Sequence, residues 1–153
     1  MKNRLFFTYV LIASTLVLSG CTKENNSERS KRVKNPVVYF EIPVTDIDRA
    51  SAFYEKLFGY KLERTSIDGN EMAMFPTDDA GAGISGALAK GDSYVPGKQG
   101  SRIYFKTLNI DDNLQKAVNA GGKVNYPKTS IGDLGWVAEF VDSEGNIIAL
   151  HSD

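Results

Sequence analysis

The sequence is poor in the residues that crosslinks and many reactions depend on. Its 153 residues include one cysteine, Cys21, one histidine, His151, and one tryptophan, Trp136. A single cysteine cannot form an intramolecular disulfide, and it excludes CxxC redox motifs and cysteine-based zinc sites. The folded part of the chain therefore depends on its hydrophobic core for stability.

The chain also has no apolar run long enough to span a bilayer comfortably, which takes about 20 residues. An uncharged, mostly apolar run of 14 residues, 5–18, follows Lys2 and Arg4. This order predicts a signal peptide over residues 1–20. The stretch Leu18-Ser19-Gly20-Cys21 resembles the lipobox of bacterial lipoproteins, which implies cleavage before Cys21 and lipidation of that residue. The alternative is an ordinary signal peptide whose cleavage site happens to precede a cysteine.

Residues 22–35 contain only one apolar side chain, Val33, so they cannot bury enough apolar surface to fold. Five basic and two acidic residues make the segment net basic. We expect residues 21–35 to be a flexible, lipid-anchored tether, either a solvated spacer or a segment that contacts anionic headgroups. Thr22 replaces the aspartate that retains lipoproteins in the inner membrane. By that resemblance, we expect an outer-membrane location in the bacterial cell envelope.

The remaining residues, 36–153, have the size of a single domain with a substantial core. Setting aside the seven basic and two acidic residues of the first 35 leaves 11 basic and 17 acidic residues, a net charge of −6. No basic stripe remains to neutralise phosphates, so a nucleic-acid partner is excluded.

A strand, a capped turn and an amphipathic helix ending at glycine occur in order over residues 37–59 and again over residues 103–122. The offset of 63 residues also relates Ile84 to Ile147. It predicts an α+β domain of two βαβββ modules, about 36–90 and 101–153, because neither small sheet could bury both faces alone. We expect helices capped by Asp46 and Asn109. We expect strands over 37–44, 60–66, 71–75, 84–90, 101–107, 123–126, 136–141 and 147–152.

Three stretches carry a resemblance to a known family: FEIPVTDIDRASAFYEKLFGYKL, AGGKV with the later Pro127-Lys128, and DSEGNIIALHS. They look like the vicinal oxygen chelate superfamily, which includes glyoxalase I, extradiol dioxygenases, fosfomycin-resistance enzymes and bleomycin-binding proteins. The resemblance covers essentially all of residues 36–153. It implies paired modules that form a cleft of eight strands, but it does not fix the chemistry.

Metal-dependent members of that family place ligands on the first and last strand of each module. By the resemblance and the 63-residue offset, these positions are Tyr39, Gly86, Arg102 and Ala149. Glycine and alanine offer no donor atom, arginine is a permanent cation, and tyrosine is a poor ligand at neutral pH. We therefore predict no metal centre and no cofactor, which puts the family's metal-dependent activities in doubt.

Other residues are candidates for binding a ligand in the cleft. Alternation along a strand places side chains two residues apart on one face. The resulting aromatic and charged surface suits a small polar or aromatic molecule. The candidates are Tyr39, Glu41, Arg102, Tyr104, Lys106, Trp136 and His151.

Each candidate has a structural alternative. Glu41 could pair with Arg102 or Lys106 inside the barrel, and the tyrosines could be core residues. Trp136 could pack in the core or in a dimer interface.

Three functions fit these observations. The first is a lipid-anchored, metal-independent protein that binds a small molecule. The second is a glyoxalase-like lyase or isomerase, either metal-dependent or with side-chain-only chemistry, in which Glu41 or His151 is the base. The third is an interaction module in an envelope complex. By analogy with the family, we also expect a homodimer.

Overall fold

The computed structural model describes residues 37–77 and 83–153, and Asn35–Asp153 form one compact unit. The predicted signal peptide, the lipidation site Cys21 and the tether lie outside the described residues. Within the described part of the chain, neither helix is long and apolar enough to cross a membrane.

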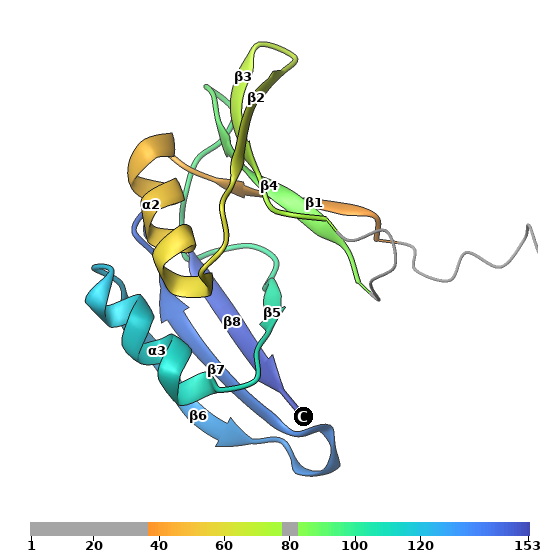
Figure 1. The fold of residues 1–153 in the computed structure, drawn as a ribbon, viewed down its shortest axis with the longest axis vertical. Coiled ribbons are helices and arrows are strands. Elements are labelled where there is room, and N and C mark those ends of the chain that lie inside the picture. The colour runs from red at the N-terminus through yellow and green to blue at the C-terminus, as the bar shows by residue number, and fades with distance from the viewer. Residues whose placement is uncertain (1–36, 78–82) are drawn as a thin grey trace, which may run out of the picture. The chain divides into compact units, whose positions relative to one another are not determined.

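Each half of the domain has one strand, one helix and three further strands, in that order (Figure 1). The first module comprises β1 (Tyr39–Pro43), α2 (Ile47–Phe58), β2 (Glu63–Ile67), β3 (Asn70–Met74) and β4 (Ser85–Lys90). The second comprises β5 (Tyr104–Lys106), α3 (Ile110–Asn119), β6 (Lys123–Ser130), the 3-10 helix η1 (Gly132–Leu134), β7 (Trp136–Val141) and β8 (Ile147–Ser152). The predicted α+β class and the two βαβββ modules are confirmed.

The two modules form separate four-stranded sheets with equivalent strand orders, β1-β4-β3-β2 and β5-β8-β7-β6. In each sheet the first strand of the module runs parallel to the last, and the other pairs are antiparallel. β1 and β5 are consequently both edge strands. This arrangement leaves one edge of each of these strands without a strand partner in its own sheet.

Side-chain caps fix where the helices begin, as predicted. The Asp46 carboxylate accepts hydrogen bonds from the backbone N–H groups of Asp48 and Arg49 at the start of α2. The Asn109 side chain accepts one from the Asp112 N–H at the start of α3. Gly59 ends α2 with φ 79°, a left-handed conformation that glycine adopts without a steric cost.

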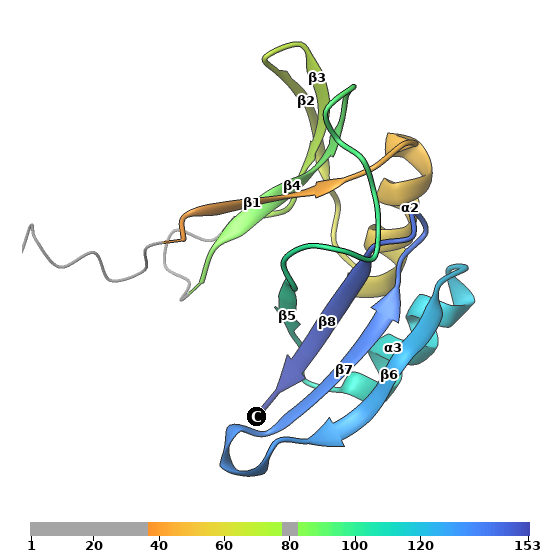
Figure 2. The same ribbon diagram turned by 180° about the vertical axis from the view of Figure 1, so that it is seen from behind.

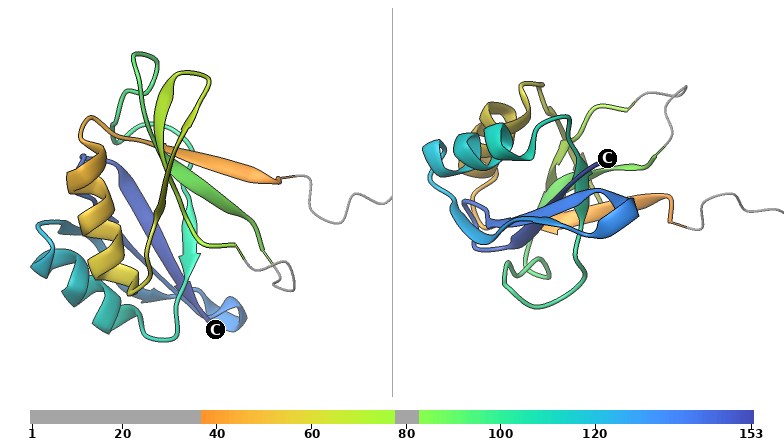
Figure 3. Two further views of the ribbon diagram at one scale, coloured as in Figure 1. Left: turned by 45° about the horizontal axis from the view of Figure 1, so that its top comes forward. Right: turned by 90° about the horizontal axis from the view of Figure 1, so that it is seen from below.

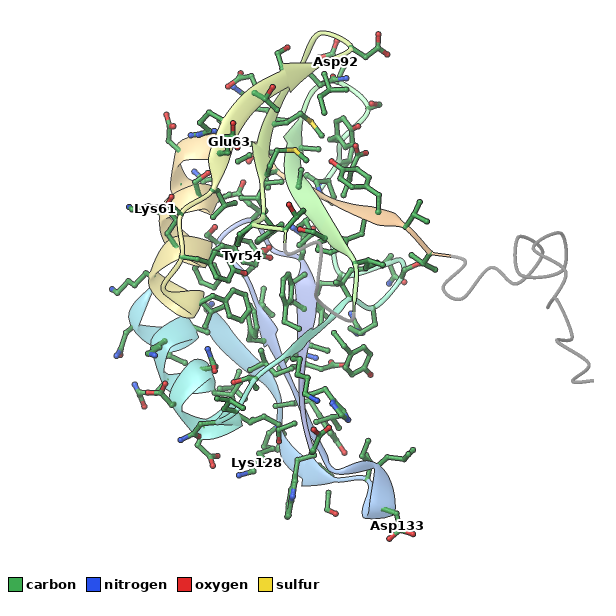
Figure 4. All side chains as sticks on the ribbon, turned by 45° about the vertical axis from the view of Figure 1, so that its right-hand side comes forward. Tyr54, Lys61, Glu63, Asp92, Lys128 and Asp133 are labelled. Atoms are coloured by element: carbon green, nitrogen blue, oxygen red, sulfur yellow. The ribbon has the colours of Figure 1, made fainter. Side chains whose placement is uncertain are left out.

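The helices pack side by side, α2 against β3 and β4 and α3 against β6 and β7 (Figure 3). Tyr54 lies fully buried in the interior between them and the sheets (Figure 4). Its ring packs edge-on against Phe53 and Phe75, and its hydroxyl donates a 2.8 Å hydrogen bond to Asp142. One continuous core therefore spans both modules.

The turn between β7 and β8 fastens the second module to the first. The Glu144 carboxylate, which has no exposed surface, accepts hydrogen bonds from Thr45 and Asp46 and forms an ion pair with Arg49 at 2.8 Å. The Asn146 amide donates to the Pro43 carbonyl at 3.0 Å. These contacts hold the β1–α2 junction against the second module.

Several predicted boundaries differ from the structure. β1 and β5 begin at Tyr39 and Tyr104, later than predicted, and β6 continues to Ser130, beyond the predicted end at residue 126. β2 begins at Glu63, because residues 60–62 connect α2 to the sheet. β7 and β8 have the predicted bounds.

Candidate functional site

A cleft of about 910 Å³ lies where the free edges of β1 and β5 approach each other. Figure 2 shows β1 and β4 extending together on one side, with β5 and β8 below them. The cleft is lined by residues of β1, the start of β4, the end of the β3 region and the segment 101–106. Its volume falls in the range of small-molecule sites.

Aromatic side chains from both modules form the floor of this cleft. Phe40, Phe75 and Phe105 lie within 6 Å of one another by ring centroid, at 5.5, 5.7 and 5.9 Å. Tyr60 packs edge-on against Phe75 at 6.2 Å, and burial raises the pKa of its phenol well above the ordinary value. The floor is thus neutral and apolar, with ring faces and edges on which an apolar ligand could pack.

Five of the seven candidate residues line the cleft: Tyr39, Glu41, Arg102, Tyr104 and Lys106. The charged groups of Glu41, Arg102 and Lys106 have partners within the protein. The Tyr94 hydroxyl donates a 2.7 Å hydrogen bond to Glu41.

The two cationic residues of the cleft, Arg102 and Lys106, form ion pairs with carboxylates that do not line the cleft. Arg102 pairs with Glu139 at 3.0 Å, and Lys106 pairs with Asp153 at 2.6 Å. The suggested pairing of Glu41 with Arg102 or Lys106 is therefore wrong, because each cation has a nearer carboxylate on its own module.

The other two candidates, Trp136 and His151, do not line the cleft. His151 lies at the end of β8, where its Nε2 is 2.8 Å from the Leu134 carbonyl oxygen. Trp136 opens β7 opposite Ser152, on the face that also carries Ala138 and Phe140. Its ring lies under the Lys128 ammonium group at 5.2 Å. The structure therefore separates both residues from the other five.

The strand register corrects one of the four metal-ligand positions. Tyr104 pairs with Ala149 in the second module, whereas Glu41, its equivalent at an offset of 63, pairs with Ala87 in the first. The last strands are thus related by an offset of 62, and Ala87 replaces Gly86 as the equivalent of Ala149. Gly86 pairs with Phe40 on the opposite face, because neighbouring residues of a strand point to opposite sides.

The residues at the corrected positions do not fit a divalent metal ion. Ala87 and Ala149 have no donor atoms, and Arg102 is already paired with Glu139. Burial and the nearby Glu41 raise the pKa of Tyr39, which disfavours the phenolate that a metal would need. Among the described residues, no group of three or more His, Cys, Asp or Glu side chains is arranged to hold a metal ion.

The sequence did not point to the aromatic floor. Phe40 and Phe105 alternate with the predicted ligand residues, so the period of two places them on the other face of their strands. Because β1 and β5 are both edge strands, the cleft reaches side chains from both faces of each strand. Tyr94, the hydrogen-bond partner of Glu41, lies between β4 and β5, where no periodic pattern identifies it.

Comparison with known proteins agrees with this geometry. Residues 37–78 match the family model described as bleomycin resistance protein-like N-terminal. A glyoxylase-like domain-containing protein of Didymella fabae is 28% identical over 114 residues, which cover 72% of this chain and 88% of that protein.

Solved structures resemble the whole domain. TnmS3, an antibiotic binding protein from Streptomyces sp. CB03234, is 25% identical with a TM-score of 0.59, over 79% of this chain and 98% of that one. A glyoxalase/bleomycin resistance protein from the same strain is 26% identical with a TM-score of 0.56, over 74% and 97% of the two chains. Together with the strand topology, these matches show the glyoxalase-like fold and a similarity to glyoxalase-like and bleomycin resistance proteins.

Proposed function

We propose that the protein binds a small, largely apolar molecule in the cleft between β1 and β5, without a metal ion. A lipid on Cys21 holds it to the bacterial cell envelope, most simply at the outer membrane. The observation that carries the proposal is an aromatic-floored cleft of about 910 Å³, lined by Tyr39 and Arg102. With Ala87 and Ala149 on the last strands, these residues hold the four positions where metal ligands are expected.

The lining of the cleft suits recognition better than catalysis. The rings of Phe40, Phe75 and Phe105 form an apolar surface in the cleft. Burying an apolar ligand against it is favourable by about 25 cal/mol for each Å² of apolar surface removed from water. The few polar groups at the wall would orient the ligand. An antibiotic binding protein among the similar structures is consistent with such a role.

A ligand screen tests the proposal. Full-length protein is assayed by thermal shift against aromatic compounds and organic acids, and hits are titrated by calorimetry. Tyr104→Ala should weaken binding about tenfold, the loss of roughly one aromatic contact. Tyr126→Ala, which removes a similarly exposed tyrosine of β6 outside the cleft, is the matched control. A flat screen, or equal losses in both variants, would contradict the proposal.

A second candidate is a lyase or isomerase step that uses side chains alone. It is favoured by one observation: Glu41 lines the cleft and could act as a base beside a bound ligand. If the screen finds a substrate, the Glu41→Gln variant should turn it over more slowly while binding it with unchanged affinity. Unchanged turnover in that variant rules out Glu41 as the base.

A further inference from the structure

The first described residues of the chain lie at the mouth of the cleft. Val37 lines the cleft itself, and β1 begins two residues later at Tyr39. The segment that precedes Val37 therefore joins the domain at the cleft mouth, and not on the far side of either sheet.

Apolar side chains surround this mouth to a greater extent than ligand binding requires. Val37, Val38, Tyr39, Ile84 and Tyr104 are exposed by 53, 79, 38, 37 and 54%. Val38 does not line the cleft, so a ligand inside it would leave this side chain in water. We call Val37, Val38, Tyr39, Ile84 and Tyr104 the rim. Clustered exposed apolar side chains mark a contact surface, and tyrosine is enriched at membrane–water interfaces.

From these observations we infer that the rim docks on the bilayer to which the chain is anchored, so that the cleft opens toward the lipid. The inference rests on the lipid anchor of the proposed function. Fourteen residues, 22–35, separate Cys21 from the domain, and a tether of that length spans roughly 20 Å on average.

The charge of the connecting segment favours the same contact. Its five basic residues outnumber its two acidic ones, so the segment has a net attraction to anionic headgroups, and this attraction keeps the start of β1 close to the membrane surface. The rim is therefore the apolar surface of the domain with the shortest connection to the lipid. A ligand dissolved in the bilayer could then enter the cleft without crossing water.

Site-specific fluorescence tests this orientation. Mature protein, lipidated at Cys21, is reconstituted in vesicles of phosphatidylcholine and phosphatidylglycerol, with Val38→Cys or Ile84→Cys labelled by an environment-sensitive dye. Glu63→Cys is the matched control, because Glu63 is an exposed residue of β2, the strand farthest from β1 in its sheet. Figure 4 shows Glu63 on the side away from the start of β1. Lipidation blocks Cys21, so the protein without an introduced cysteine should take up no dye.

The rim labels should shift to the blue and be quenched by lipids that carry a shallow spin label. The label at residue 63 should instead be quenched by aqueous iodide. Equal iodide quenching at all three positions would overturn the docking while leaving the anchor intact. Dye uptake at Cys21, with protein that stays off the vesicles, would overturn the anchor and the docking together. Ligand binding by the same sample reports on the cleft independently of either result.

Discussion

At the scale of single residues, Glu144 is a buried carboxylate that joins the second module to the first through Thr45, Asp46 and Arg49. Burial alone would raise its pKa, but hydrogen bonds from Arg49 and Thr45 and from backbone N–H groups lower it to about 2, from an ordinary value of 4.5. A depressed folded-state pKa stabilises the fold above the unfolded pKa, and this stabilisation is lost as the pH falls from about 4.5 to about 2.

Glu144→Gln should therefore lower the free energy of unfolding by roughly 3 kcal/mol at pH 7, because an amide cannot accept all the hydrogen bonds of the carboxylate. The difference from the unsubstituted protein should shrink as the pH approaches 2. Urea unfolding at several pH values measures it. Glu63→Gln, on the exposed strand β2, should have no comparable effect. A Glu144→Gln deficit that is the same at pH 7 and pH 2 would contradict this role.

Asp142 acts in the opposite direction on the same turn. Burial raises its pKa, and hydrogen bonds from Asn146 and Tyr54 offset part of the increase. A carboxyl group whose pKa is raised on folding loses its stabilising contribution as the pH rises through its unfolded pKa. The pH dependence of unfolding in the unsubstituted protein therefore contains the contributions of both Asp142 and Glu144. Comparing Glu144→Gln with the unsubstituted protein isolates the contribution of Glu144.

At the scale of elements, the pairing of β1 with β4 depends on Gly86. An added Cβ at this position would lie 2.1 Å from the Phe40 carbonyl oxygen and 2.7 Å from its ring. Gly86→Ala should thus force the two strands apart and lower the free energy of unfolding by about 2–3 kcal/mol.

The same variant should disturb the cleft, because Phe40 is part of its floor. Gly97→Ala is the matched control: a Cβ there meets nothing within 4 Å. Thermal unfolding of the two variants makes the comparison. Equal melting temperatures would show that Phe40 moves aside without cost.

The elements also show where sequence reasoning succeeds. Caps and apolar periodicity located both helices, since Asp46, Asn109 and Gly59 each satisfy backbone groups within a few residues. The pair Asp68-Gly69 is typical of a two-residue hairpin turn, and both residues have positive φ in the structure. These signals are local, and the sequence contains them in full.

Register between strands is not local, and there the prediction was wrong. The last strands, β4 and β8, are related by an offset of 62 residues and not by the predicted 63. Gly86 therefore lies on the opposite face, and Ala87 occupies the expected ligand position. The side chains that a cleft exposes depend on how two sheet edges approach each other. The sequence therefore identified five of the wall residues but not the aromatic floor, and it placed His151 and Trp136 in a site that they do not line.

At the scale of the whole molecule, two modules share one core and leave one cleft between their edge strands, in the described part of the chain. The fold is that of enzymes and binding proteins alike, so the residues in the cleft have to decide between them. Here they offer aromatic surface, paired charges and a neutral tyrosine where metal-dependent relatives would coordinate an ion.

Metal-free binding is tested most directly by titrating one aromatic ligand from the screen into the full-length protein, as purified and after dialysis against a strong chelator. The metal content of both samples is measured by elemental analysis. The dissociation constants should agree, and no transition metal should be present in stoichiometric amount, because Tyr39, Ala87, Arg102 and Ala149 offer no suitable donors. Binding that is lost on chelation and restored by a divalent metal would contradict metal-free recognition in this cleft.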